Sequence, residues 1–356
     1  MSERHALVVG VTGISGYNTA EHLLAEGWDV SGVSRRPPQG LPGVAHVAVD
    51  VTDADATRAA LAGSDSTHLF FCTWARQPTE AENIAVNGAM LRNVLAGLED
   101  DGALRHVALV TGLKHYLGPF ESYGQVKPDT PFREEQGRVD FPNFYYEQED
   151  ILFAEAERRG FTWSVHRAHT MIGWALGNAM NMGVTLAVYG AICRETRRPF
   201  AFPGSPQQWE GITDVTDARL LARQLEWAAT TPAAANEAFN IVNGDVFRWR
   251  RMWSVVAEGL GVEPAPYSGE PAPLEEQMRD AAPVWERVVE RHGLEPTPVD
   301  RLASWWHTDA DLGRPLETFT DMSKSRRFGF LDYQQTDRSF LDLFERLRGA
   351  RIIPAA

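Results

Sequence analysis

Short apolar runs alternate with longer amphipathic segments through the first half of the chain. Apolar runs of this length are typical of strands buried on both faces, whereas apolar residues spaced three and four apart indicate helices. A regular alternation of the two predicts a parallel, doubly wound α/β sheet with helices on both faces. The expected strands cover residues 5–11, 28–34, 44–49, 67–72, 106–111 and 162–166, and the clearest expected helices cover 14–26 and 80–98.

The pattern changes near residue 174. Longer amphipathic segments follow, broken by turns that are rich in proline and glycine. One short apolar run at about 239–243 has the character of a further strand of the same sheet. We therefore expect a sheet domain over residues 1–173, to which the strand at 239–243 returns, and a smaller, mostly helical lobe over 174–356.

The composition is that of a soluble globular protein and disfavours several classes of partner. Hydrophobic residues make up 44% of the chain and charged residues 23%, and the formal net charge is −14. A negative charge of this size disfavours binding to nucleic acid or to an anionic membrane. No apolar stretch approaches the roughly 20 residues that cross a bilayer. Cys72 and Cys193 lie in apolar runs, which predicts buried free thiols in a reducing, cytoplasmic compartment.

A glycine-rich segment between the first strand and the first helix indicates a dinucleotide site. Gly10, Gly13 and Gly16 are spaced for a tight turn in which the main chain approaches a pyrophosphate closely. The phosphates then lie beside the free amides at the positive end of the helix. Thr12 and Ile14 belong to the same turn and are expected to contact the cofactor. The alternative is an ordinary glycine-rich turn, but the strand–turn–helix context favours a Rossmann-type domain.

The residues after the second strand bear on which dinucleotide is bound. Sites that prefer NAD usually carry an acidic residue there, which binds the ribose hydroxyls. This chain has Ser34, Arg35 and Arg36 instead. Two adjacent guanidinium groups suit a 2′-phosphate, so the sequence predicts NADPH/NADP+ as the cofactor. The alternative is a solvated basic pair at the end of a strand.

Further cofactor contacts are expected where the next strands end, because ligands of doubly wound sheets bind at the carboxyl ends of the strands. Asp50 and Val51 follow the third strand, where such folds contact the adenine. Thr73 and Trp74 follow the fourth strand, beside the expected nicotinamide half. Thr111 ends the fifth strand and is assigned to the same cofactor site.

The predicted catalytic helix departs from the usual pattern of short-chain dehydrogenases. Those enzymes carry Tyr-x-x-x-Lys, in which one helical turn places both side chains on the same face. Here Tyr145 is followed four residues later by Glu149. A tyrosine needs a nearby cation to act as a proton donor or oxyanion partner near neutral pH. Lys114, just after the fifth strand, is the candidate for that cation, and Tyr146 is expected to be a packing residue.

Several motifs together resemble the progesterone 5β-reductase/iridoid synthase (PRISE) family, an atypical branch of the extended short-chain dehydrogenases/reductases. They include VGVTGISG, SRR, TGLKHYLGPFESYG, NFYYEQED, WSVHR and NEAFNIVNGDVFRW, which span nearly the whole chain. The resemblance implies an NADPH-dependent ene-reductase, which reduces the C=C bond of α,β-unsaturated carbonyl compounds by 1,4-addition of hydride. It also implies that Lys114 and Tyr145 are the catalytic pair, and Tyr145 is counted among the cofactor contacts as well.

One segment departs from the pattern of that family. The family continues with Pro-Gly after WSVHR, whereas this chain has Ala168 and His169. The segment resembles the main-chain stretch that lines the nicotinamide, so the family pattern does not define its exact cofactor contacts in this chain. His169 is interpreted as a structural histidine with satisfied hydrogen bonds or, alternatively, as a polar wall of the pocket.

Aromatic residues are the candidate walls of a substrate pocket. Aromatic character and the resemblance together select Trp74, Tyr116, Phe120, Phe328 and Phe330. Each of them is equally compatible with plain core packing. The pocket is expected to take a small enone or enal, with steroids and terpenoids among the candidates.

Other functions stay open at this point. A carbonyl reductase or a nucleotide-sugar epimerase or dehydratase would use the same fold, although Glu149 in place of lysine disfavours epimerase chemistry. A non-enzymatic NADP-binding sensor would keep the glycine motif and discard Lys114 and Tyr145. The histidines and cysteines have no metal-ligand spacing, so no metal is expected. A homodimer is one assembly that the sequence leaves open.

Overall fold

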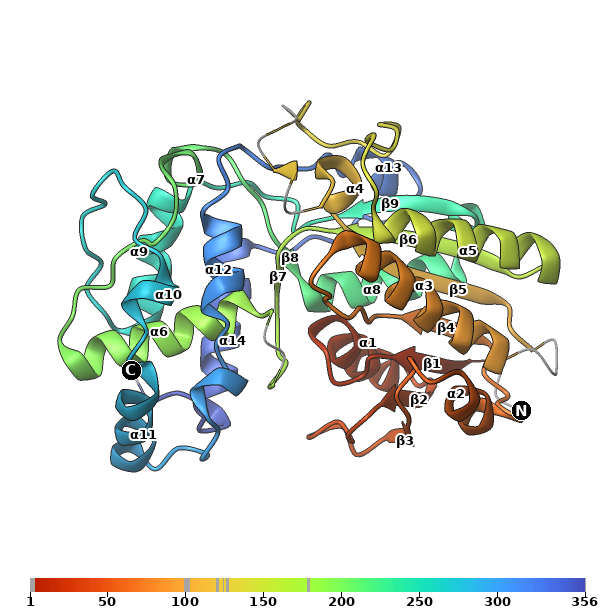
Figure 1. The fold of residues 1–356 in the computed structure, drawn as a ribbon, viewed down its shortest axis with the longest axis horizontal. Coiled ribbons are helices and arrows are strands. Elements are labelled where there is room, and N and C mark those ends of the chain that lie inside the picture. The colour runs from red at the N-terminus through yellow and green to blue at the C-terminus, as the bar shows by residue number, and fades with distance from the viewer. Residues whose placement is uncertain are drawn as a thin grey trace.

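A seven-stranded sheet forms the core of the protein, and neighbouring strands pair in parallel (Figure 1). The computed structural model describes residues 4–98, 103–119, 122–123, 125, 128–177 and 180–355. The strand order is β3-β2-β1-β4-β5-β6-β9, so the chain moves outward from β1 in both directions. This order is that of a doubly wound Rossmann-type sheet, which confirms the predicted fold class.

The elements of the sheet and its flanking layers have the following bounds. The strands are β1 (His5–Val9), β2 (Asp29–Ser34), β3 (Val44–Ala48), β4 (His68–Phe71), β5 (His106–Gly112), β6 (Thr162–Ala168) and β9 (Glu237–Ile241), with β7 (Met171–Ile172) and β8 (Thr216–Asp217) forming a separate parallel pair. The helices beside the sheet are α1 (Ile14–Ala25), α2 (Ala54–Leu61), α3 (Glu80–Gly97), α4 (Lys114–Leu117), α5 (Phe144–Arg159), α8 (Ala218–Thr230), η2 (Pro232–Ala234) and α13 (Ser323–Arg327).

The two faces of the sheet carry separate hydrophobic cores. Successive side chains of a strand point to opposite faces. Along β1, Leu7 and Val9 pack with residues of α2, α3 and α5, whereas Ala6 and Val8 pack with residues of α1 and α8. Because both faces are covered, the strands are continuous apolar runs, and this explains why the sequence shows them so clearly.

After residue 173 the chain returns to the sheet over residues 218–241, which form α8, η2 and β9, and again at α13, which contacts β9. The strand expected at 239–243 is β9 (Glu237–Ile241), which pairs with β6 at the edge of the sheet. In addition, α8 packs against α1 and buries Leu220, Leu221 and Leu225 on the sheet. The expectation of a single return was therefore incomplete, since an amphipathic helix does not show in the sequence which layer it covers.

The remaining helices form a second lobe beside the carboxyl edge of the sheet (Figure 1). Its core contains the buried indoles of Trp253 and Trp285, and Phe200 stacks on Trp253 with ring centres 4.2 Å apart. None of the helices in the described ranges combines the length and the apolar character that a membrane span requires. The lobe consists of α6 (Met182–Thr196), α7 (Pro206–Glu210), α9 (Trp249–Leu260), α10 (Leu274–Gln277), α11 (Ala281–His292), η3 (Val299–Arg301), α12 (Trp305–Leu312) and α14 (Thr336–Gly349).

Candidate active site

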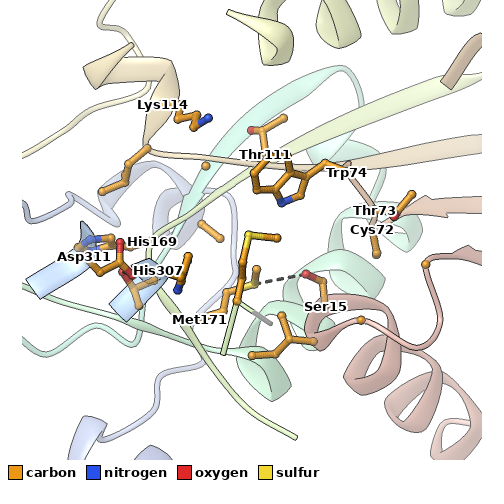
Figure 2. Close-up of a pocket in the computed structure, with 18 of the residues that line it drawn as sticks. Ser15, Cys72, Thr73, Trp74, Thr111, Lys114, His169, Met171, His307 and Asp311 are labelled. Carbon is orange, nitrogen blue, oxygen red and sulfur yellow. Dashed lines mark hydrogen bonds between the residues drawn. The ribbon is translucent and has the colours of Figure 1, made fainter. Parts of the chain in front are cut away.

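A cavity of about 340 Å³ opens at the carboxyl edge of the sheet, where strand ends meet the helical lobe (Figure 2). The turn after β1 and the ends of β4, β5 and β6 supply one part of its lining, and α12 supplies another. Ligands of doubly wound sheets bind at this edge. The cavity is therefore the candidate active site.

The glycine turn after β1 is packed too tightly for side chains. Gly10 has a φ of 86°, which favours glycine, and a Cβ there would lie 2.7 Å from the Cβ of Thr73. A Cβ on Gly16 would lie 2.3 Å from the carbonyl oxygen of Gly10. Gly13 lies in the cavity lining at the N-terminus of α1, beside Thr12 and Ile14. This bare turn at a helix N-terminus fits the pyrophosphate of a dinucleotide.

Of the two arginines after β2, only Arg35 belongs to the cavity lining among the described residues. Its guanidinium lies 3.9 Å from the Asp50 carboxylate and is largely exposed. Hydrogen bonds from Thr52, with a smaller effect of Arg35, lower the pKa of Asp50, so this carboxylate stays charged. Arg36 is exposed, and its carbonyl accepts a hydrogen bond from the hydroxyl of Ser34 at 2.6 Å.

The other expected cofactor contacts divide into two groups. Thr73, Trp74 and Thr111 lie in the cavity lining at the ends of β4 and β5 (Figure 2). Val51 is buried instead, and its carbonyl accepts a hydrogen bond from Asn93 at 2.9 Å. Among the described residues, neither Val51 nor Asp50 belongs to the lining: Asn93 of α3 bonds to the Val51 carbonyl, and the Asp50 side chain is half-exposed.

Lys114 and Tyr145 line the same cavity, although they are 31 residues apart in the chain. The Nζ of Lys114 lies 5.2 Å from the ring centre of Trp74 and 5.1 Å from that of Phe144. The Tyr145 hydroxyl approaches bare Gly112, where a Cβ would lie 3.4 Å from it. Burial, and to a lesser degree Tyr123 and Glu80, raises the pKa of Tyr145, so its phenol is protonated at neutral pH.

The start of α5 holds the segment that carries Lys114. The side-chain amide of Asn143 donates a hydrogen bond to the Lys114 carbonyl at 2.6 Å. The hydroxyl of Tyr146 donates to the His115 carbonyl at 2.5 Å and accepts from the amide of Val139 at 3.0 Å. Tyr146 was predicted to be a packing residue, and this was incomplete: its hydroxyl joins α5 to α4. The sequence did contain a signal for these contacts. Asn143, Tyr146 and Glu149 are spaced three residues apart and therefore lie on one face of the helix.

Glu149 occupies the helix position that holds lysine in ordinary short-chain dehydrogenases. Its side chain is only 3% exposed and accepts a hydrogen bond from Arg138 at 3.0 Å. The other carboxylate oxygen lies 3.6 Å from both His115 and Arg167. Burial raises the pKa of Glu149, but His115, Arg167 and Arg138 together lower it below its usual value. The carboxylate is therefore charged, and it cannot supply the positive charge that a lysine supplies at this position.

Of the described aromatic residues that were predicted to form pocket walls, Trp74 lines the cavity, Tyr116 and Phe330 are buried in the core, and Phe328 is partly buried against it. Tyr116 stacks on Phe132 with ring centres 4.8 Å apart, and its hydroxyl donates to Asn240 at 2.6 Å. The pocket assignments of Tyr116, Phe328 and Phe330 thus need correction, because β9, α8 and α13 give these rings an apolar environment. Phe328 packs edge-on to Phe239, Phe330 packs against Trp227, and Phe120 lies outside the described residues.

Both interpretations of His169 apply at once. It belongs to the cavity lining, and both ring nitrogens are hydrogen-bonded. Nε2 accepts from Arg314 at 2.6 Å, so Nδ1 carries the proton and donates to Asp214, also at 2.6 Å. Burial, followed by the charge of Arg314, lowers the pKa of His169 and keeps the ring neutral.

The helical lobe contributes polar lining residues that the sequence interpretation missed. His307 and Asp311 lie one turn apart on α12, and Arg314 follows that helix. No sequence motif indicates these three residues, because they reach the cavity only through the packing of α12 against α6 and α10. Cys72, which was predicted to be buried, is half-buried in the lining, and burial of its thiol raises its pKa to about 12.

The fold and the site together define a Rossmann-fold oxidoreductase. Residues 51–354 match the PRISE-like Rossmann-fold domain family, and the chain belongs to that family. It is 42% identical to an (S)-8-oxocitronellyl enol synthase from Camptotheca acuminata, over 98% of this chain and 93% of that protein. It is 40% identical to a 3-oxo-Delta(4,5)-steroid 5-beta-reductase from Arabidopsis thaliana, over 99% of this chain and 94% of that protein.

Solved structures with similar folds include epimerases. One from Methanothermobacter thermautotrophicus has a TM-score of 0.70 at 15% identity and covers 96% of this chain and 91% of its own. A UDP-glucose 4-epimerase from Thermus thermophilus, solved in complex with NAD, has a TM-score of 0.66 at 15% identity and covers 97% and 99%. At such low identity the similarity concerns the fold alone.

Proposed function

We propose that the protein reduces the C=C bond of α,β-unsaturated ketones and aldehydes with NADPH. The observation that carries this proposal is that Lys114 and Tyr145 line one cavity, while the position four residues after Tyr145 holds a buried carboxylate. The catalytic cation thus comes from the end of β5 and not from the helix of the tyrosine. The names of the relatives, an enol synthase and a steroid 5-beta-reductase, agree with reduction at a conjugated double bond.

The chain's own residues fit a phosphorylated dinucleotide. Gly10, Gly13 and Gly16 would accept the pyrophosphate, since side chains at Gly10 and Gly16 would fill the turn. Arg35 would face the 2′-phosphate from the end of β2. When bound, NADPH supplies the hydride for the β-carbon of the substrate.

Lys114 and Tyr145 would stabilise the charge that develops on the substrate. As the β-carbon is reduced, negative charge collects on the carbonyl oxygen and an enolate forms. Tyr145 donates a hydrogen bond to that oxygen, because burial raises the pKa of its phenol and keeps it protonated. Lys114 adds positive potential beside the same oxygen. Solvent then supplies the proton to the α-carbon, so the product is a saturated carbonyl compound.

The test is an NADPH-oxidation screen over enals, cyclic enones, monoterpene dialdehydes and 3-keto-4-ene steroids, with product analysis. We expect saturated aldehydes or ketones with the carbonyl intact. Lys114→Ala and Tyr145→Phe should each lower turnover by about 10²- to 10⁴-fold while NADPH binding is retained. Tyr333→Phe is the matched control, because Tyr333 is exposed. Mainly allylic alcohol, or rapid reduction of saturated ketones, would favour a carbonyl reductase instead.

A further inference from the structure

The ammonium group of Lys114 lies beside two stacked aromatic rings. Its Nζ is 5.2 Å from the ring centre of Trp74 and 5.1 Å from that of Phe144, and the two ring centres are 5.3 Å apart with planes inclined by 19°. A cation within about 6 Å of a ring centre is attracted by the ring, most strongly where water is excluded. Lys114 and Trp74 line the cavity (Figure 2), and Lys114 is only 7% exposed. These contacts favour one position of the ammonium in the cavity.

Phe144 has surroundings unlike those of an ordinary core residue. It is fully buried, yet among the described residues it does not belong to the hydrophobic cores on the two faces of the sheet. Besides Trp74 and Lys114, its ring contacts that of Tyr145, with ring centres 4.3 Å apart. Phe144 is not part of the described cavity lining, so it can affect a substrate only through these neighbours.

Helix α3 fixes both segments that carry the stacked rings. The Oε1 of Glu80 accepts a hydrogen bond from the main-chain amide of Phe144 at 2.8 Å. This amide is one of the first N–H groups of α5, which have no partner within the helix, and a carboxylate is stabilised beside them. Asn87 holds the segment after Trp74, because its side chain accepts from the Ala75 amide at 2.7 Å and donates to the Ala75 carbonyl at 2.9 Å. One helix therefore sets the positions of both rings.

We propose that Phe144 is a positioning residue, whose ring, together with that of Trp74, holds the ammonium of Lys114 where charge develops on the substrate. Glu80 fixes Phe144 in this role through the main chain. Because the lysine and Tyr145 lie on separate elements, the rings supply the fixed spacing that a shared helix supplies in Tyr-x-x-x-Lys enzymes. The inference rests on the proposed function, since it assumes that Lys114 acts on a bound enone or enal.

The test is a double-variant cycle on the whole protein, with 2-hexenal and 2-cyclohexenone as substrates. Phe144→Leu removes the ring and keeps an apolar side chain, whereas Lys114→Met removes the charge and keeps the length of the lysine. We expect Phe144→Leu to lower kcat by roughly tenfold when Lys114 is present, because a displaced ammonium stabilises the developing charge less well. In the Lys114→Met background it should change kcat by less than about twofold, since no ammonium is left to hold. The dissociation constant of NADPH should stay within about twofold in all of these proteins.

Further variants test the role of the ring and that of Glu80 separately. Phe153→Leu is the control for loss of a ring, because Phe153 packs on Trp163 farther along α5, and it should leave kcat unchanged. Glu80→Ala should lower kcat by about three- to tenfold, whereas Glu80→Gln should keep most of it, because an amide oxygen can accept the same hydrogen bond. Glu157→Ala, at an exposed position of α5, is the control for loss of a carboxylate.

The outcomes separate this inference from the function on which it rests. An equal loss of kcat from Phe144→Leu in both backgrounds, or no loss in either, overturns the positioning of Lys114 by the ring. Equal kcat values for Glu80→Ala and the wild type overturn the role of Glu80. Failure of the wild type to reduce either substrate overturns the proposed function, whereas reduction without coupling between Phe144 and Lys114 overturns only this inference. A loss of stability in Phe144→Leu leaves the comparison valid, because that loss is common to both backgrounds.

Discussion

Asn143 and Lys114 are joined by a hydrogen bond of 2.6 Å from the side-chain amide to the main-chain carbonyl. The Oδ1 of the same side chain accepts from the amide of Tyr145 at 3.0 Å, so Asn143 also caps α5. One buried side chain thus contacts the main chain of both proposed catalytic residues. The distance between the lysine and the tyrosine depends on this link, because the two residues lie on separate elements.

Loss of the hydrogen bond between Asn143 and the Lys114 carbonyl should lower kcat while most of the unfolding free energy is retained. Asn143→Ser keeps a good N-cap but is too short to reach the Lys114 carbonyl. We expect it to retain most of the unfolding free energy and to lower kcat by roughly tenfold, measured by denaturant titration and steady-state kinetics. Asn143→Ala should lose about 1 kcal/mol of stability as well. Asp53→Ser, at the N-cap of remote α2, is the control, and equal kcat values for all of these proteins would refute the link.

A lysine at position 149, the usual helix position, should not restore the activity that is lost in Lys114→Ala. Glu149 is buried beside Arg138 and Arg167, so Glu149→Lys would place a third cation among them. We expect Lys114→Ala/Glu149→Lys to be as inactive as Lys114→Ala, and less stable by about 3 kcal/mol or more. Thermal unfolding and NADPH oxidation would be measured on both proteins. Recovery of turnover in the double variant would show that the usual geometry is still available.

The two arginines after β2 should contribute unequally to cofactor preference. Arg35 lines the cavity and Arg36 does not belong to its described lining. Arg35→Ser should raise the KM for NADPH by about tenfold or more and leave the KM for NADH nearly unchanged. Arg36→Ser should have a smaller effect, and Arg58→Ser on the exposed face of α2 should have none. Retention of the full NADPH preference in Arg35→Ser would remove this arginine as the discriminating residue.

Stability should fall as the pH drops below 6.5, because three buried histidines are neutral in the folded protein. Burial lowers the pKa of His68 to about 4, that of His106 to about 3 and that of His166 to about 4. The unfolded chain takes up these protons near pH 6.5 and the folded protein only near pH 3 to 4, so stability present above pH 6.5 is lost down to about pH 4. These three groups contribute about 4 kcal/mol per pH unit to the slope near pH 5, and His169, whose pKa burial also lowers, adds to it, so urea titrations should give at least that slope.

A single variant tests the origin of that slope. His106→Gln removes one of the three protons and should reduce the slope by about 1.4 kcal/mol per pH unit, whatever its effect on stability at neutral pH. His292→Gln should leave the slope unchanged, because His292 is exposed. Constant stability between pH 7 and pH 5 would contradict the assignment of neutral buried histidines.

The strands, and the placement of Lys114 and Tyr145 in one cavity, could be predicted because their signals are local. The strand expected at 5–11 ends at Val9, since Gly10 adopts a φ of 86° and turns the chain out of the sheet. Lys114 follows a strand, and Tyr145 lies near the start of a helix, so the topology brings both to the same edge. The predicted strands therefore differ from the observed strands only at their ends, and by a few residues at most.

The remaining wall could not be predicted, because it depends on packing between distant segments. His307 reaches the cavity only because α12 packs against α6 and α10. Tyr116 has the aromatic character of a pocket wall, yet its hydroxyl donates a hydrogen bond to Asn240 of β9 and its ring is buried in the core. In each case a partner more than a hundred positions away, α6 for His307 and Asn240 for Tyr116, helps to decide the role of the side chain, and the periodicity of the sequence does not indicate such a partner.

The double return of the chain to the sheet limits how this protein can be recombined with its relatives. A fragment ending at residue 173 would lack α8 and β9, so the part of one face of the sheet that α8 covers and the edge at β6 would be exposed. The nucleotide-binding half is thus not a detachable module. A chimaera that exchanges substrate lobes needs junctions near residue 173, before α8, after β9 and on both sides of α13, so that residues 218–241 and α13 remain with the nucleotide-binding half.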